Sequence, residues 1–294
     1  MPRSAIGSAL ALLLPFLLAS SPAAAATPAK PTQSAKSVAA AKPPATTKSD
    51  NAKGAGAAMD ACMSDEPKTA VAGCSALIDA GDPSPERRLA EYVNRGTAYA
   101  RLGLSRAAMA DLDKAVVLAP SSAQAYLARG LANGHMGRLD QAIADFTQAI
   151  ALQPDFAAAY RGRAHAYETR SMYDRALADY DKTVALAPDD DSGYNGRAWV
   201  KHLMGRDGDA LGDADKAVSL DPKDADSIET RAEIEEKLGH HDQALADYRA
   251  ALEIAPKMQS ALDGLKRLGE DSTADVGPAG RAPPPTEVAP PTVA

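Results

Sequence analysis

The feature that most constrains the fold of this chain is a proline that recurs at a fixed period of 34 residues. These prolines are Pro120, Pro154, Pro188, Pro222 and Pro256. A period of this length is typical of a stacked array of one small unit, because each unit packs mainly against its two neighbours. We therefore expect an elongated repeat array and not a globule with one central core.

Alignment of the five units shows small residues at two fixed places. The first small column comprises Gly96, Gly130, Ala164, Ala198 and Ala232. The second comprises Ala108, Ala142, Ala176, Ala210 and Ala244. Four residues after the second column, on the same helical face, stand Leu112, Phe146, Tyr180, Ala214 and Tyr248. Between the two small columns lie Gly103, Gly137, Ser171, Gly205 and Gly239. Each unit is therefore predicted to be a helix, a tight turn and a second helix that ends before the proline.

These columns resemble the tetratricopeptide repeat family, whose unit is a helix-turn-helix of the same length with small residues in both helices and a terminal proline. The resemblance covers 89–258. The repeats are 89–122, 123–156, 157–190, 191–224 and 225–258. The resemblance implies an all-α fold, a right-handed solenoid of five tandem repeats.

The chain departs from the family pattern at a first-helix position where the family often has leucine. Arginine stands there in every unit, as Arg95, Arg129, Arg163, Arg197 and Arg231. An aspartate recurs in every second helix, as Asp111, Asp145, Asp179, Asp213 and Asp247. A charge at a half-buried interface between repeats needs a partner, because an uncompensated charge there is costly. We therefore predict that each arginine forms an ion pair with an aspartate of this column.

The N-terminus has the pattern of a secretory signal peptide. Arg3 precedes an apolar run of 11 residues at 9–19, and small residues follow up to Ala26. The run is too short to span a bilayer, which needs about 20 apolar residues. We expect 1–26 to be a signal peptide cleaved near Ala26, and the mature protein to be periplasmic or secreted, without stable membrane insertion. The alternative is an uncleaved anchor.

Two stretches lack the apolar residues that a core needs. Segment 27–56 is rich in alanine, proline and lysine, and 270–294 is rich in proline. Both are predicted to be disordered, because they cannot bury enough apolar area to offset the entropy of ordering. The first is interpreted as a solvated spacer or a contact for anionic surfaces, and the second as a plain tail or a polyproline ligand.

The two ends of the array are predicted to carry caps. Segment 57–88 is a partial repeat that holds both cysteines of the chain, Cys62 and Cys74. In an exported protein, a pair at this spacing favours a disulfide over a metal site. A disulfide would staple this partial repeat over the first full repeat. Residues 258–268 are predicted to form the closing helix, so that the whole solenoid domain covers 57–269.

No motif in the sequence predicts catalysis. The histidines lack the HExxH spacing of metalloproteases, and there is no GxSxG elbow or phosphate-binding loop. We therefore expect a protein that is not an enzyme and has no cofactor or metal. Residues 57–269 carry 25 basic and 34 acidic side chains, a net charge of −9. This charge disfavours nucleic acid as a partner, because phosphate contacts need a basic surface.

The resemblance also implies where a partner would bind. In the family, the first helices line a concave groove. The matching residues here are Val93, Thr97, Leu127, Leu131, Arg161, His165, Asn195, Trp199, His202, Glu229 and Glu233. Along the array this set changes from apolar to polar and aromatic and then to acidic. An extended peptide with an apolar end and a basic end would suit that gradient.

The resulting hypothesis is a noncatalytic scaffold or adaptor that binds a protein or peptide partner in this groove. Two alternatives remain open: binding of cell-wall glycan, with Trp199 stacked on a sugar, or a role as accessory subunit of a periplasmic enzyme. Self-association is a third. Trp199 also has a purely structural interpretation, since it could fill the space that the small Ala214 leaves between repeats.

Overall fold

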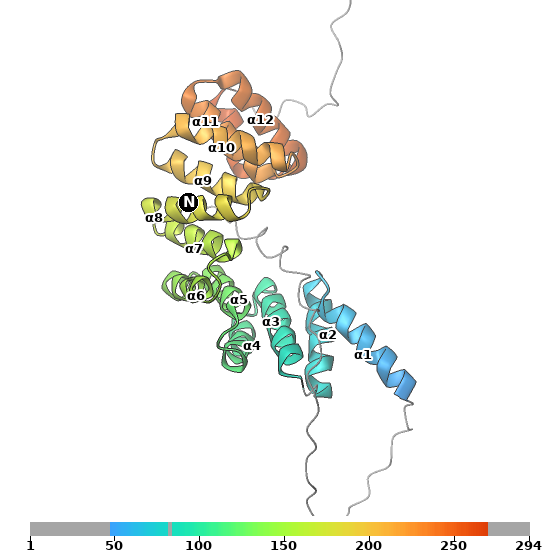
Figure 1. The fold of residues 1–294 in the computed structure, drawn as a ribbon. Coiled ribbons are helices and arrows are strands. Elements are labelled where there is room, and N and C mark those ends of the chain that lie inside the picture. The colour runs from blue at the N-terminus through green and yellow to red at the C-terminus, as the bar shows by residue number, and fades with distance from the viewer. Residues whose placement is uncertain (1–47, 82–83, 270–294) are drawn as a thin grey trace, which may run out of the picture.

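The computed structural model describes residues 48–81 and 84–269, and this part of the chain is all α-helix and loop. Within these described residues, thirteen helices follow one another along a curved array, from α1 at one end to α12 and the closing helix at the other (Figure 1). No described helix has the length and the apolar character that a bilayer crossing requires. The predicted all-α solenoid is confirmed.

Each of the five predicted repeats supplies one pair of helices that pack against each other. The pairs are α3 (Pro85–Arg101) with α4 (Ser105–Leu118), α5 (Ala123–His135) with α6 (Leu139–Leu152), α7 (Ala157–Thr169) with α8 (Tyr173–Leu186), α9 (Asp191–Leu203) with α10 (Asp207–Leu220), and α11 (Ala225–Leu238) with α12 (His241–Ile254). In every repeat the second helix ends just before the column proline, which cannot continue it. The turn between the two helices contains a residue with positive φ, for example Gly137 at 69° and Ser171 at 57°.

The small columns allow neighbouring helices to approach closely around one large side chain. Phe146 of α6 lies between Gly130 of its own repeat and Gly162 of the next, and a Cβ atom on either glycine would come within 2.7 Å of the ring. Gly196 meets Tyr180, and Gly264 meets Tyr248, in the same way, since a Cβ atom added to either glycine would lie only 2.3 Å from the ring. In these three repeats, the ring of the second helix therefore sets the spacing to the element that follows.

Every column arginine pairs with the aspartate that follows sixteen residues later, as predicted. The closest nitrogen–oxygen distances are 2.5 to 2.7 Å, and in each pair Nε and Nη2 both donate to the carboxylate. The aspartates are buried or nearly so, with side chains 5 to 14% exposed. Bidentate contacts of this kind fix geometry as well as charge.

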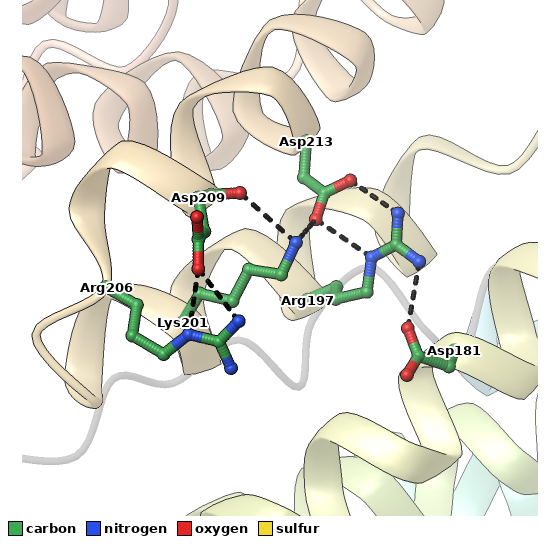
Figure 2. A network of polar contacts seen from close by, with 6 residues as sticks. All are labelled: Asp181, Arg197, Lys201, Arg206, Asp209 and Asp213. Atoms are coloured by element: carbon green, nitrogen blue, oxygen red, sulfur yellow. Dashed lines mark hydrogen bonds and ion pairs between the residues drawn. The ribbon is translucent and has the colours of Figure 1, made fainter.

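The remaining arginine nitrogen, Nη1, reaches back to the second helix of the preceding repeat. Arg197 Nη1 lies 2.9 Å from Asp181 while the other two nitrogens hold Asp213 (Figure 2). Arg129 and Arg231 make equivalent contacts, whereas Arg163 donates to the hydroxyl of Thr147 and Arg95 to that of Ser75. One guanidinium thus ties two consecutive repeats together at every junction. We call this series of contacts the arginine ladder.

Two further groups reinforce the arginine ladder. The guanidinium carbon of each of the first four arginines lies 5.6 to 5.9 Å from the ring centre of the tyrosine three residues earlier, a distance suited to cation–π attraction. In repeat four, Lys201 Nζ also lies 2.6 Å from Asp213 (Figure 2). Burial alone would raise the pKa of Asp213, but the hydrogen bonds and charges of Arg197 and Lys201 outweigh it and lower that pKa.

Caps close both ends of the described array. At the N-terminal end, α1 (Lys48–Cys62) and α2 (Pro67–Ala80) are joined by the Cys62–Cys74 disulfide, with 4.5 Å between the two Cα atoms. At the other end, α13 (Gln259–Arg267) packs against α12 and α11. Both predicted caps are confirmed.

The helix α1 begins earlier than the sequence patterns indicated. It starts at Lys48, inside the segment 27–56 that was predicted to be disordered. The last proline before it is Pro44, so no proline interrupts the chain between Pro44 and Cys62. The predicted signal peptide 1–26, residues 27–47 and the tail 270–294 lie outside the described residues.

The ring packing generates a test. Gly196→Ala would place a Cβ atom against the buried Tyr180 ring, and we expect it to lower the free energy of unfolding by about 1–3 kcal/mol. Gly212→Ala in α10 is the matched control, because no atom lies within 4 Å of the added Cβ there. The control should be neutral or stabilising, by up to about 1 kcal/mol. Urea denaturation followed by circular dichroism measures both, and equal losses would contradict the packing argument.

The arginine ladder generates a second test. Arg163→Met leaves the buried carboxylate of Asp179 without its bidentate partner, and we expect a loss of about 3 kcal/mol in the free energy of unfolding. Asp181→Asn removes only the contact of an exposed carboxylate with Arg197, and it should cost less than about 1 kcal/mol. Thermal and urea unfolding compare the two variants. A cost for Arg163→Met no larger than that for Asp181→Asn would show that the ladder does not hold the repeats together.

Candidate functional site

The first helices of the repeats form the inner face of the curve. Helices α3, α5, α7, α9 and α11 contact one another in succession, whereas within the described residues no second helix contacts the next second helix. An array whose first helices lie closer together must bend towards them. We therefore call the surface formed by these five helices the concave face (Figure 1).

All eleven residues that the resemblance assigned to partner binding lie on these five helices, but they are not equally accessible. Val93, Leu127 and Glu229 are buried, with 8, 0 and 2% of their surface exposed. For these three, the expected role as contact residues is corrected: they belong to the packed interior of the array. The other eight keep part of their surface exposed, and they are Thr97, Leu131, Arg161, His165, Asn195, Trp199, His202 and Glu233.

The part of the concave face nearest the N-terminal cap is apolar. Leu131 on α5 is partly exposed and packs against the cluster that contains Leu127 and Phe146. Thr97 on α3 is its counterpart one repeat earlier. A polypeptide that covers this region would bury aliphatic surface and meet few charges.

Arg161, at the centre of the face, already has a structural partner. Its Nη1 lies 2.6 Å from Asp190 Oδ2, and the side chain is only 15% exposed. Asp190 also caps α9, because its carboxylate accepts a hydrogen bond from the backbone N–H of Ser192. Arg161 therefore helps to fix the start of the next repeat, and its charge is largely compensated.

His165, one turn after Arg161 on α7, lies 3.5 Å from the carboxylate of Glu168. Burial lowers the pKa of His165, but the hydrogen bond and the charge of Glu168 outweigh burial and leave that pKa raised. The same carboxylate accepts a hydrogen bond from the hydroxyl of Tyr180. On the neighbouring repeat, burial and the proximity of His165 lower the pKa of His135.

Trp199 and His202 form a stacked pair on α9. Their ring centroids are 5.2 Å apart with an angle of 29° between the planes. The imidazole is held from two other helices, since Nδ1 lies 2.5 Å from Asp207 Oδ1 at the start of α10, and Nε2 lies 3.9 Å from Glu233 Oε2 on α11. The structure thus brings together three of the predicted residues, Trp199, His202 and Glu233, at the junction of repeats four and five.

Sequence reasoning missed a further column of the concave face, which lies three residues after the second predicted column. In repeats one to five it holds Ala100, Gly134, Glu168, His202 and Glu236. Only His202 had been assigned. The spacing i, i+3 along one helix was the available signal, because it places a residue on the same face. Glu236 accepts hydrogen bonds from Tyr248 and Arg267, and its pKa is lowered first by Arg267.

This additional column follows the predicted gradient from apolar to charged residues along the array. Small residues stand in repeats one and two, and ionisable residues stand in repeats three to five. Sequence reasoning also missed Asp207, which lies on a second helix and reaches the face only because it starts α10 beside His202. Within 48–81 and 84–269, no three His, Cys, Asp or Glu side chains are grouped so that they could hold a metal ion.

Comparisons with known proteins agree with this architecture. Two models of the tetratricopeptide repeat match the chain, one over 123–156 and the other over 92–122 and 225–258. The structure of PilF from Pseudomonas aeruginosa is similar with a TM-score of 0.53 at 17% identity, and it covers 63% of this chain and 93% of PilF. Residues 41 to the end of MamA from Desulfovibrio magneticus RS-1 are similar with a TM-score of 0.50 at 19% identity, over 58% of this chain and 97% of the other. No protein of curated function matches the sequence.

The stacked pair generates a test of how much Trp199 contributes to packing. Trp199 is partly exposed, whereas Phe146 is 1% exposed at the centre of a core cluster. We expect Trp199→Ala to lower the free energy of unfolding by about 1 kcal/mol, and Phe146→Ala to lower it by about 3–5 kcal/mol. Urea denaturation of both variants measures the difference. A loss for Trp199→Ala as large as that for Phe146→Ala would assign the indole to the core and not to a binding surface.

Proposed function

Because the chain belongs to the tetratricopeptide repeat family, we propose that it is a noncatalytic scaffold or adaptor that binds a partner polypeptide on its concave face. One observation carries the proposal. The first helices of five consecutive repeats line one continuous face, and eight side chains of varied chemistry are partly exposed on it. A curved face of this length suits an extended segment that contacts several repeats in turn.

The chemistry of the face indicates the kind of segment. Leu131 and Thr97 offer an apolar region in the first two repeats, and carboxylates from Glu168 to Glu236 accumulate in the last three. A partner with an apolar stretch followed by basic side chains would match both regions in one orientation only. The gradient therefore also fixes the direction in which the partner runs.

We place this activity in the periplasm or outside the cell. The support is the signal-peptide pattern of 1–26 together with the Cys62–Cys74 disulfide. Disulfides persist in oxidising compartments and are rare in the cytosol. The disulfide joins the two helices of the cap, so reduction would loosen the end of the array next to repeat one.

The second candidate function is binding of cell-wall glycan, alone or as the accessory subunit of a periplasmic enzyme. The observation that favours it is the partly exposed indole of Trp199 with the carboxylates of Asp207 and Glu233 nearby. An indole face can stack on a sugar ring, and carboxylates can accept hydrogen bonds from hydroxyl groups.

A photocrosslinking experiment in intact cells tests the proposal. A photoreactive phenylalanine analogue replaces Leu131 on the concave face, and in a matched control it replaces Val117 on the second helix α4, where the side chain is 79% exposed. We expect illumination to join a defined polypeptide to the Leu131 variant and not to the Val117 variant, with the adduct in the periplasmic fraction. Mass spectrometry identifies the partner.

Other outcomes of the same experiment discriminate among the alternatives. An adduct with glycan supports the second candidate, and an adduct with another copy of this chain supports self-association. The absence of any adduct specific to the Leu131 variant contradicts the adaptor function. Recovery of the adduct in the cytosolic fraction contradicts the proposed location and leaves the adaptor function standing.

A further inference from the structure

A groove at the open end of the first helical hairpin lies apart from the residues assigned to partner binding. It lies where the start of α3 meets the end of α4, and its volume is about 350 Å³. This volume is at the lower end of the range for ligand pockets, which is about 300–1,000 Å³. The residues that line it are Arg88, Tyr92, Asp113, Lys114, Val117 and Leu118. We call this cavity the repeat-one groove.

The apolar side chains of the repeat-one groove are more exposed than packing within the array requires. Val117 is 79% exposed, the highest value among the exposed large apolar residues of the described chain, and Leu118 beside it is 42% exposed. The other repeats have small or polar residues at the place of Val117, namely Ala151, Ala185, Ser219 and Glu253. An exposed patch of adjacent apolar side chains of this kind indicates a contact surface.

The repeat-one groove also presents a positive charge beside an aromatic ring. Lys114 Nζ lies 5.1 Å from the centre of the Tyr92 ring, and no carboxylate of the described residues forms an ion pair with it. Asp113, the acidic residue of the lining, is paired with Arg129 at 2.9 Å. A ligand with apolar surface and a carboxylate would therefore suit the groove.

Repeat one differs in net charge from the repeats that follow it. It has four basic and three acidic side chains. Repeats two to five have 2, 5, 5 and 4 basic side chains against 3, 6, 7 and 8 acidic ones, so all four are negative. An acidic segment is thus attracted to repeat one and repelled by the remainder of the array.

Two segments of this chain outside the described residues differ in their fit to the groove. Segment 27–47 has three lysines and no acidic residue, whereas the tail 270–294 has four acidic residues, one arginine and six prolines. Only the tail has the charge that suits repeat one. Proline-rich segments also favour the polyproline II helix, which aromatic-lined grooves bind at a low entropic cost.

We propose that the tail 270–294 docks in the repeat-one groove of the same chain. Glu287 faces Lys114, and Pro290 lies on Tyr92 and Val117. Glu287 and Pro290 are three residues apart, which is one turn of a polyproline II helix, so both side chains lie on the same side of the segment. The inference goes beyond the proposed function, because it assigns a ligand to a surface away from the concave face.

The tail is long enough to reach the groove of its own chain. It follows α13, at the end of the array opposite to repeat one (Figure 1). Helices pack about 8–10 Å apart, so the five repeat spacings between α3 and α13 amount to about 50 Å. The 18 residues from Gly269 to Glu287 span up to about 60 Å when extended.

Attachment to the same chain also compensates for the small size of the groove. A short segment in a cavity of this volume binds weakly by itself, but a tether gives it an effective concentration in the millimolar range. The docked tail joins the last helix to the first repeat, and it therefore opposes straightening of the array.

Photocrosslinking within the purified full-length protein tests the docking. A photoreactive phenylalanine analogue replaces Leu118 in the groove. In the matched control it replaces Leu186, which has the same place in repeat three and is 40% exposed. After illumination and digestion, mass spectrometry identifies the linked peptides. We expect links to 270–294 in about fivefold higher yield from the Leu118 position than from the Leu186 position, with a yield that falls as salt is added.

Substitutions in the groove locate the contact. With the photoreactive group at position 118, Val117→Ser removes apolar surface and Lys114→Gln removes the positive charge, and each should lower the yield of the link by about threefold. Lys182→Gln is the matched control, because Lys182 is the counterpart of Lys114 in repeat three. It should leave the yield unchanged. Circular dichroism confirms that each variant is folded.

A mixture of light and heavy isotope-labelled protein distinguishes the tail of the same chain from that of another copy. We expect only light–light and heavy–heavy links. A light–heavy link, a link from position 118 to 27–47, equal yields at the two positions, no link at all, or an unchanged yield in both groove variants would each overturn the docking. A link within one chain adds no second polypeptide, so the Val117 control in the test of the adaptor function keeps its expected result.

Discussion

The stacking of this array depends on one side chain that can serve two repeats at once. Each column arginine directs two nitrogens to an aspartate of its own repeat and the third to the repeat before it. A leucine at that place could add apolar contact, but it could not specify a partner atom on each side. Buried ion pairs add little net stability compared with apolar packing, because desolvation offsets the attraction. Their contribution here is geometric. A guanidinium with one partner in each of two neighbouring repeats allows only one relative position of those repeats.

The relative position of neighbouring repeats also determines the concave face. When the first helices are held closer together than the second helices, the array bends and the first helices turn one side inward. Small residues make this close approach possible. The rings of Phe146 and Tyr248 lie directly against Gly162 and Gly264, where any larger residue would overlap the ring. The concave face is therefore a consequence of how the repeats pack, and its shape requires no contribution from a partner.

The sequence predicted the parts of the structure that repeat. Five copies of one pattern define the hairpins, and an arginine and an aspartate in each copy sufficed to predict the ion pair within each repeat. Three features were beyond it. The period assigns a residue to a face but not to a depth, so the burial of Leu127 and Glu229 was missed. Contacts between different helices, such as Asp207 with His202, depend on how a turn is oriented. The start of α1 at Lys48 lies outside the repeats, where no periodic signal exists.

The residues that are the same in every repeat stabilise the array, whereas the residues that differ between repeats lie where a partner would bind. The ladder positions are arginine and aspartate in all five repeats, whereas the concave positions differ from one repeat to the next. Not every polar residue on the concave face is available to a partner, however. Arg161 is engaged by Asp190, Glu168 by Tyr180, and Glu236 by Arg267. The partly exposed concave residues that differ between repeats, such as Leu131 and Trp199, are then the positions at which arrays of this kind can differ in what they bind. An array of this kind can change its partner by changing such residues while the arginine ladder, and with it the curve, stays the same.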